Sequence, residues 1–426
     1  MQTSINLFSY LKNFQFQSPQ ASFAFTEGAA VAVDSAKTRI ARGVADDIKY
    51  VKFINEFWTA RQRQAASIHE ISFRACFKPQ LPRFFINLLT EPGDVVYDPF
   101  SGRGTTVLEA GLNGREVIAN DVNPLSRFMS YPRFFIPEPH LLAKRLAEIF
   151  VDKSLRADRN LSMFFHPETE AEIVSLANYL QIRQETGRED HLDAWIRMVA
   201  TNRLTGHSPG FFSVYTLPPN QAVLPERQLR INLKRNQKPE YRDTKRLILK
   251  KSQRLISGLT RQQMRNLRQV GEKALFISND ARHTPEIADE SVQLTVTSPP
   301  FLNVVQYASD NWLRCWFNAI NPEMVAKKIT SCSTLPAWSE VMGDVIKELY
   351  RITRPGGWVA FEVGEVRNGT IRLDEAVVPL GAAAGFECNG ILINQQQFTK
   401  TANIWGVQNN KKGTNSNRIV MFQKPD

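Results

Sequence analysis

The apolar positions of this chain show a clear period from about residue 94 onward. Asp94–Asp98 is a short apolar run that ends in an acid before a proline, and Glu116–Asp121 is a second such run. Between them, Gly104–Asn113 has the pattern of a helix. Two strands separated by a helix indicate a parallel βαβ unit. Further strand patterns follow later in the chain, at 274–280, 292–297, 358–363, 391–394 and 418–423.

The region between the first two strands and the later ones has a helical period, for example at Leu142, Leu146 and Ile149. The proline-rich stretch that follows is typical of a loop. We therefore expect one α/β sheet that is interrupted by a helical insertion. The predicted units are an N-terminal arm, the first half of the sheet domain, the insertion, and the second half with the C-terminal strands, over residues 1–65, 66–135, 136–270 and 271–426.

Positive charge is concentrated in one part of the insertion. The formal net charge of the chain is +11. Residues 227–268 contain fourteen Lys and Arg against two acids, which is +12, so the rest of the chain is close to neutral. A solvated helix face is one interpretation, but so concentrated a block favours contact with a polyanion. The representative phosphate contacts that we predict are Arg227, Lys250, Lys251 and Arg254.

Several protein classes are disfavoured by the sequence. No apolar stretch approaches the length needed to span a bilayer, and the N-terminus lacks the pattern of a signal peptide. The four cysteines lie far apart without a CxxC pair, which argues against a zinc site and a disulfide framework. We therefore expect no metal site and a cytoplasmic location.

The turn after the first strand has the composition of a nucleoside-binding loop. Asp98 is followed by Gly102 and Gly104, where an open α/β sheet binds its ligands. A P-loop would need a Gly-Lys-Ser/Thr sequence, and the NAD motif would need a third glycine. Asp98 can instead hold a cationic amine. Asp121, after the second strand, can accept both ribose hydroxyls, and Asp280, after the third, can reach an adenine amino group. Each acid alone is more typical of a cap or turn, but three acids at successive strand ends favour a nucleoside cofactor.

The run from Gly93 to Thr106 resembles the cofactor motif of the amino-group DNA methyltransferases, and the segment Phe77–Pro82 is similar to the motif just upstream of it. The resemblance covers about 66–135 and 271–365. It implies a Rossmann-like class I methyltransferase sheet of seven strands, with S-adenosyl-L-methionine lying over the two glycines and 66–135 as the cofactor-binding half. The expected cofactor-binding residues are Asp98, Phe100, Gly102, Gly104, Thr105, Thr106, Asp121, Asp280, Phe77 and Pro79.

By the same resemblance, Ser298-Pro299-Pro300-Phe301 is the catalytic tetrad (Asp/Asn/Ser)-Pro-Pro-(Tyr/Phe/Trp), and its serine form is typical of N4-cytosine enzymes. An exocyclic amine is a poor nucleophile because its lone pair is delocalised into the ring. The Ser298 hydroxyl and the Pro299 carbonyl can accept the two amine protons and localise that lone pair. Prolines fix the backbone, and Phe301 offers a face on which an extruded base can stack. Taken alone, the four residues would be an ordinary turn.

We therefore expect a site-specific DNA methyltransferase that modifies the N4 amino group of cytosine in double-stranded DNA after base flipping. A prokaryotic or phage origin and a cognate restriction endonuclease are part of this expectation. Many serine-type cytosine enzymes have the two motifs in the reverse order, so three alternatives stay open. These are N6-adenine methylation, methylation of an RNA base, and a non-catalytic DNA-binding subunit.

Overall fold

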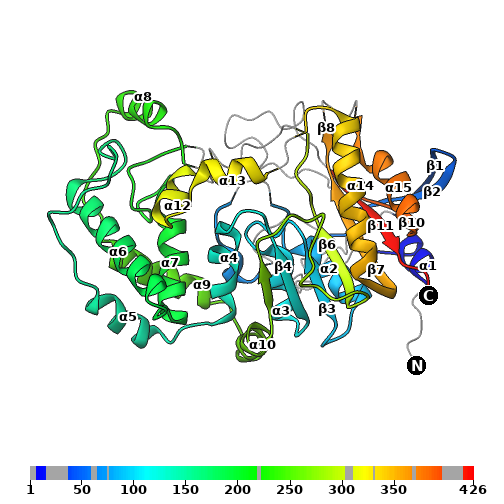
Figure 1. Ribbon diagram of the computed structural model, residues 1–426, viewed down its shortest axis with the longest axis horizontal. Helices are drawn as coiled ribbons and strands as arrows, with labels where there is room; N and C mark the ends of the chain where they lie inside the picture. The colour runs from blue at the N-terminus through cyan, green and yellow to red at the C-terminus, as the bar shows by residue number, and fades with distance from the viewer. Residues whose placement is uncertain are drawn as a thin grey trace, which may run out of the picture.

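The parallel βαβ unit that the apolar pattern predicts is present, as strand β3 (Val95–Asp98), helix α3 (Thr105–Leu112) and strand β4 (Glu116–Asn120). The computed structural model describes residues 6–15, 37–58, 65–73, 76–217, 222–302, 310–329, 332–366, 371–395 and 416–426. The unit lies toward one edge of a large twisted sheet, where only β5 lies beyond β4 (Figure 1).

The main sheet has nine strands among the described residues, in the order β1-β2-β10-β11-β7-β6-β3-β4-β5. Strands β3 to β7 of this series run parallel, and β11 is antiparallel to both of its neighbours. All six residues of β6 are buried, as expected for a central parallel strand covered on both faces. Besides β3 and β4, the strands are β1 (Arg39–Ala45), β2 (Ile48–Asn55), β5 (Leu275–Ile277), β6 (Val292–Thr297), β7 (Thr353–Val363), β10 (Glu387–Gln395) and β11 (Ser416–Gln423).

Seven of these strands, β5-β4-β3-β6-β7-β11-β10, form a Rossmann-like sheet with one antiparallel member. The expected α/β fold class is therefore confirmed, but the expected number of strands is too small. The two additional strands, β1 and β2, form a hairpin in the N-terminal arm, and β2 pairs parallel with β10. The arm shows no clear apolar period in the sequence, because β1 is mostly exposed and the buried residues of β2, Tyr50, Phe53 and Asn55, are divided between its two faces.

Helices cover both faces of the sheet. Adjacent residues of β3 point to opposite sides, so that Val96 belongs to one apolar cluster and Tyr97 to the other. Helices α2 (Gln80–Leu89) and α3 pack on the Val96 side, whereas α14 (Leu335–Ile352) and α15 (Leu373–Ala384) pack together on the Tyr97 side.

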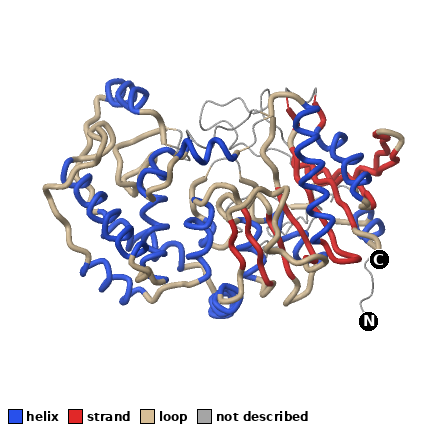
Figure 2. Tube along the Cα trace, in the orientation of Figure 1, coloured by secondary structure: helices blue, strands red, loops and turns tan. Residues whose placement is uncertain are grey.

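Most of the helices between β4 and β5 gather beside the sheet and not over it (Figures 1 and 2). Between β4 and β5 the chain forms α5 (Pro139–Glu148), α6 (Pro167–Glu185), α7 (His191–Arg203), α8 (Pro225–Arg235), α9 (Thr244–Ile256) and α10 (Arg261–Gly271). Helix α10 returns to the sheet and packs on α3. The other five form a helical group, named here α5–α9. The predicted division into domains stays a prediction.

A second chain segment joins this helical group. Helices α12 (Trp312–Phe317) and α13 (Pro322–Lys328) follow β6 in sequence, yet α12 contacts α7. The Trp312 indole donates to the Val223 carbonyl at 3.3 Å, and the Asn318 amide donates to the Thr201 hydroxyl at 2.9 Å. The chain that leaves the predicted tetrad is therefore attached to the insertion.

The short helices and strands of the described residues are α1 (Leu7–Lys12), η3 (Ser67–His69), α4 (Leu125–Ser130), η4 (Tyr131–Phe134), β8 (Glu365–Val366) and β9 (Ile371–Arg372). None of the helices in the described part of the chain combines the length and the apolar character that crossing a membrane requires.

Candidate active site

The two predicted motifs meet at the carboxyl ends of neighbouring strands. Asp98 is the last residue of β3 and Thr297 the last of β6, and these strands pair in parallel. The Thr297 hydroxyl donates a hydrogen bond to the Asp98 carboxylate at 2.7 Å. The glycine-rich loop and the Ser298 tetrad therefore begin side by side, although 199 residues separate Asp98 from Thr297.

The carboxylate of Asp121 links the glycine-rich loop to the turn after β4. One of its oxygens accepts the Gly102 N–H at 2.8 Å, and the other accepts the Asn123 N–H at 2.9 Å. The residue that we predict to bind a ribose therefore also holds the loop in place. Each carboxylate oxygen has a further lone pair, so this role leaves the acceptor function open.

The two glycines of the loop differ in their surroundings. Both have positive φ, +52° at Gly102 and +74° at Gly104. A Cβ at Gly104 would come within 2.5 Å of the Ser130 side chain, whereas a Cβ at Gly102 would have the Phe73 ring, 3.6 Å away, as its nearest neighbour. Gly104 therefore allows α3 to pack closely on α4. Gly102 keeps the backbone open on the side where a ligand would approach.

Burial makes the two acids at this edge unusually basic. Asp98 is only 1% exposed, and burial raises its pKa to about 7 despite hydrogen bonds from Thr297 and the Phe100 N–H. Burial likewise raises the pKa of Asp121 to about 6, and the negative charge of Asp121 adds to the shift of Asp98. A cationic group between them would relieve both costs. This arrangement suits a ligand with an ammonium or a sulfonium group.

The other predicted cofactor residues lie around the loop with different roles. Thr106 is fully buried and its hydroxyl donates to the Val296 carbonyl at 2.9 Å, so it attaches α3 to β6. Buried Thr105 accepts a bond from the Arg103 side chain at 3.1 Å. Phe100 and Phe77 are half-buried, and the Phe77 carbonyl accepts a bond from Arg103 at 3.4 Å. Pro79 is buried at the start of α2.

Asp280, the third predicted acid, has a partner of its own. Its carboxylate forms a two-pronged contact with the Arg282 guanidinium, at 2.9 and 2.5 Å, which holds the pKa of Asp280 below its usual value. The side chain is 43% exposed. None of its described contacts joins it to Asp98 or Asp121, so the structure brings together two of the three predicted acids.

The tetrad is fixed by contacts with two neighbouring elements. The indole of Trp338, at the start of α14, donates to the Pro300 carbonyl at 2.9 Å. The Phe301 ring lies against Gly364, where a Cβ would approach within 2.9 Å of the ring. Pro299 is buried, and Ser298 and Phe301 are half-buried. A serine hydroxyl on so well-supported a turn is held in position without reorganisation.

One residue of the site is missed by the sequence reasoning, which assigns its strand to support alone. Glu362, on β7, is 8% exposed, and its carboxylate accepts a hydrogen bond from the Asn417 amide at 3.0 Å, while the nearby Ser298 hydroxyl acts to lower its pKa. Burial raises the pKa of Glu362 above its usual value. An acid inside the otherwise apolar run Trp358–Val363 is the feature of the sequence that could have indicated it.

A known family matches the part of the chain that carries the loop. The match to the DNA methylase family of N6 and N4 methyltransferases covers residues 33–125, from the hairpin β1–β2 through Gly102 to Asp121. Residues 33–125 therefore resemble the DNA methylase family. The Ser298 tetrad lies outside the methylase match and is placed beside it by the sheet.

Two curated proteins are similar to parts of this chain. The type II methyltransferase M.MvaI of Kocuria varians is 26% identical over 162 residues, which are 37% of this chain and 31% of that protein. The type II methyltransferase M.PvuII of Proteus hauseri is 33% identical over 76 residues, 18% of this chain and 22% of that protein. The matched regions span about a third of the first relative and less of the second.

Two solved structures resemble this chain at lower sequence identity than the two type II methyltransferases do. TrmN from Thermus thermophilus is 14% identical over 85% of this chain and 53% of its own, with a TM-score of 0.31. A second Thermus thermophilus protein, named as a DNA modification methylase, was solved with S-adenosyl-L-methionine. It is 21% identical over 35% of this chain and 54% of its own, with a TM-score of 0.23.

The side chains of the basic segment 227–268 lie partly on the surface and partly in the interior. Arg227 and Lys250 are exposed, as predicted, and Arg254 is 69% exposed. Lys251 is only 8% exposed, so it does not lie on the exposed face of the helix with Lys250. The reason is helical geometry, because Lys251 shares the buried face of α9 with Ile248 and Leu255.

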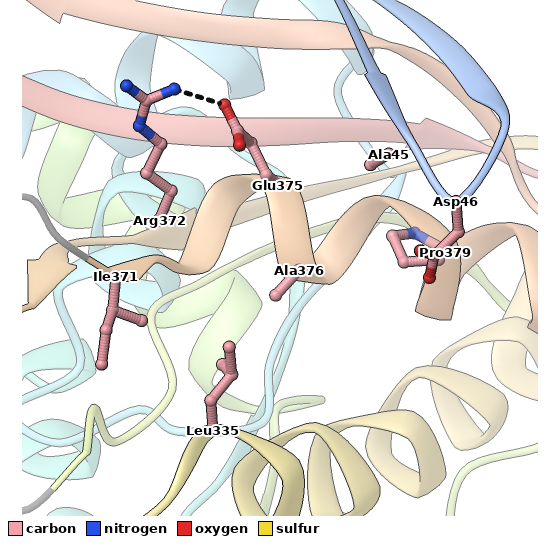
Figure 3. Close-up of a pocket in the computed structure, with 8 residues that line it drawn as sticks. All are labelled: Ala45, Asp46, Leu335, Ile371, Arg372, Glu375, Ala376 and Pro379. Atoms are coloured by element: carbon pink, nitrogen blue, oxygen red, sulfur yellow. Dashed lines mark hydrogen bonds and ion pairs between the residues drawn. The ribbon is translucent and has the colours of Figure 1, made fainter.

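The pocket drawn in Figure 3 lies elsewhere. It is lined by the tip of the β1–β2 hairpin, Leu335, and residues of β9 and α15, among them the paired Arg372 and Glu375. None of the predicted site residues lines it. Among the described residues, no three His, Cys, Asp or Glu side chains come together as metal ligands would.

Proposed function

We propose that this protein is an S-adenosyl-L-methionine-dependent DNA methyltransferase that modifies the N4 amino group of cytosine. The observation that carries the proposal is the position of Ser298. It follows β6, next to the buried Asp98, and its hydroxyl lies near the Glu362 carboxylate. The family match, which covers the loop and Asp121, supports methyl transfer to DNA.

The residues at the loop fit the proposed cofactor. The pKa values of buried Asp98 and half-buried Asp121 are raised, and Gly102 leaves its backbone open. S-adenosyl-L-methionine, a nucleoside with an ammonium and a sulfonium group, would supply an activated methyl group. Asp98 would hold its cationic part, and Asp121 would accept the ribose hydroxyls while still holding the loop.

The tetrad would prepare the amine for attack. Ser298 would donate its own proton to the nearby Glu362, so that its oxygen is left to accept a proton of the target amine. The Pro299 carbonyl would accept the second, so that the nitrogen lone pair points toward the methyl carbon. When the amine becomes positively charged it must lose a proton. Glu362, with its raised pKa, can take up that proton through the Ser298 hydroxyl.

The substrate is duplex DNA in this proposal, and the target base is flipped out of the helix. An amino group within a base pair is not accessible to the tetrad, and the half-buried Phe301 ring offers a stacking surface. The serine form of the tetrad supports cytosine over adenine. The similarity to type II methyltransferases supports a cognate restriction endonuclease as partner and a cytoplasmic location in a prokaryotic host.

Transfer of labelled methyl groups to DNA tests this proposal. Wild-type protein incubated with unmethylated genomic DNA and methyl-labelled cofactor should label the DNA. Ser298→Ala should reduce the rate by about 100-fold or more, as for other positioned hydrogen-bonding groups, while cofactor affinity stays unchanged. The matched control is Ser291→Ala, which removes a hydroxyl at the other end of β6. Near-normal turnover in Ser298→Ala would refute the role of the tetrad.

A further inference from the structure

A group of positive side chains lies where the helical group α5–α9 meets the segment that precedes the glycine-rich loop. Arg203 ends α7, Lys251 and Arg254 lie on α9, and Glu70 follows η3. Helix α9 packs against both α7 and η3. One Glu70 carboxylate oxygen contacts the Lys251 ammonium at 3.5 Å and the Arg254 guanidinium at 2.6 Å. We name these four residues the Arg203 cluster.

The charges of the Arg203 cluster do not balance. Lys251 and Arg254 share the Glu70 carboxylate, and Arg203 has no ion pair among the described residues, although Arg203 and Lys251 are only 9% and 8% exposed. Burial and the neighbouring cations lower the pKa of Arg203 to about 10 and that of Lys251 to about 8. Buried charges are normally paired, because an unpaired one is poorly solvated. A purely structural ion network would supply a second acid here.

Arg203 also has an unused donor. Its guanidinium lies over the Phe211 ring at 3.9 Å and donates to the Asn202 side chain at 2.8 Å. Its Nε–H is buried and makes no hydrogen bond. A buried donor without an acceptor destabilises the folded protein, because the donor has lost its hydrogen bond to water. The cluster therefore has both a positive charge and a buried donor that an anion would satisfy.

The cluster lies close to the candidate active site. Glu70 precedes Phe73 by three residues, and the Phe73 ring is the nearest group to the Cβ position of Gly102. Three residues of extended chain span at most about 10 Å. The Asn202 amide, next to Arg203, donates to the Ser72 carbonyl at 3.1 Å and fixes this segment on α7. Arg254, at 69% exposure, connects the cluster to solvent.

We propose that the Arg203 cluster binds a backbone phosphate of the DNA substrate, close to the nucleotide that is methylated. Arginine and lysine are the side chains that bind phosphate oxygens best, and one phosphate would balance the excess charge. In the protein without DNA, the Glu70 carboxylate occupies this phosphate site, named here the seat. The phosphate displaces Glu70 when DNA binds. This inference rests on the proposed function, because it needs DNA as the substrate.

Binding of a mixed-sequence 30-base-pair duplex at several salt concentrations, followed by fluorescence anisotropy, tests the seat. Arg254→Gln should weaken binding and reduce the slope of log K against log salt by about 0.9, the value for one lost phosphate contact. The matched control is Lys273→Gln, which removes a charge of similar exposure (71%). Lys273 is paired with Glu116, the first residue of β4, at the amino ends of the parallel strands. Lys273→Gln should leave the slope unchanged.

Glu70→Gln separates a phosphate seat from a structural ion network. In a seat, loss of the competing carboxylate should strengthen DNA binding several-fold, even if thermal stability falls. In a network, it should leave DNA affinity unchanged or lower it. Equal slopes for Arg254→Gln and Lys273→Gln, or no gain in affinity for Glu70→Gln, would overturn the inference.

Two further measurements identify the anion and keep this inference apart from the proposed function. Calorimetric titration with S-adenosyl-L-methionine should give equal affinities for wild type and Arg254→Gln. A loss of cofactor affinity would assign the seat to the cofactor carboxylate and overturn the phosphate assignment. Methyl transfer by the wild type tests the proposed function independently. Labelled DNA together with equal salt slopes would leave that function standing and remove only the seat.

Discussion

The carboxyl edge of strands β3 and β6 and the surface of α9 are both rich in functional side chains, yet only the first follows directly from sequence order. At the strand edge, Asp98 and Thr297 meet although they are far apart in the chain. On α9, the adjacent residues Lys250 and Lys251 differ in exposure. Lys250 is exposed, whereas Lys251 is buried against Glu70.

The difference lies in what determines each position. Parallel strands of an α/β sheet end at a common edge, so a motif that follows a strand is placed there by the fold class alone. A charge on a helix is placed by which face the helix buries, and for α9 that depends on partners in η3 and α7. A run of basic residues therefore predicts a positive region without identifying the side chains that reach its surface.

The two glycines of the loop give the largest effect on stability within the strand edge. Gly104→Ala should lower the free energy of unfolding by at least about 2 kcal/mol, because it combines left-handed backbone strain with a clash against Ser130. Gly102→Ala has the strain without the clash and should cost about 1 kcal/mol. Denaturant unfolding measures both. Equal losses would show that the packing of α3 on α4 is not the constraint.

Glu362→Gln tests whether the strand edge includes a residue that acts through Ser298. The change keeps the size of the side chain but removes the charge that orients the hydroxyl and receives the proton. The rate constant for methyl transfer should fall about tenfold, as expected for about 1.4 kcal/mol of lost stabilisation, while KM for the cofactor stays constant. A change in KM alone would instead indicate a role in binding.

Cofactor affinity should depend on pH through the two buried acids. Burial raises the pKa of Asp98 to about 7 and that of Asp121 to about 6, so both are more fully ionised at pH 8 than at pH 6. A cationic cofactor binds the ionised form, so calorimetry should show affinity rising several-fold between these values. In the free protein the sign is reversed, since ionising buried Asp98 lowers stability as pH rises from about 4 to about 7. Asp98→Asn should make cofactor affinity nearly independent of pH above pH 6. An unchanged pH dependence would show that Asp98 does not bind the cationic part of the cofactor.

The smallest effect is expected from the exposed lysine of α9. Lys250→Gln should change the free energy of unfolding by no more than about 0.5 kcal/mol, as is usual at the surface. Lys251→Gln removes a charge from a buried ion cluster and should change stability measurably. Thermal unfolding of the two single variants compares the neighbours directly, and identical curves would contradict the buried position of Lys251.

Much of the fold and part of the candidate site could be predicted from the sequence. The βαβ unit and the turn at Ser298 depend on local patterns, and their meeting follows from the fold class. The β1–β2 hairpin could not be predicted, because its partner β10 lies more than 300 residues away and its exposed strand lacks an apolar period. Asp280 was misjudged because a strand end does not reveal whether a nearby arginine engages the acid. Glu362 was missed because its hydrogen bonds come from β11 and the tetrad.

The identity of the methylated nucleoside tests the central claim most directly. Genomic DNA that lacks amino-methylated bases is incubated with the protein and methyl-labelled S-adenosyl-L-methionine, digested to nucleosides, and analysed by mass spectrometry. The serine tetrad beside the buried acids predicts labelled N4-methylcytosine, and Ser298→Ala should remove it. Labelled N6-methyladenine would contradict the base assignment, and cofactor binding without any labelled nucleoside would contradict the catalytic role of the site.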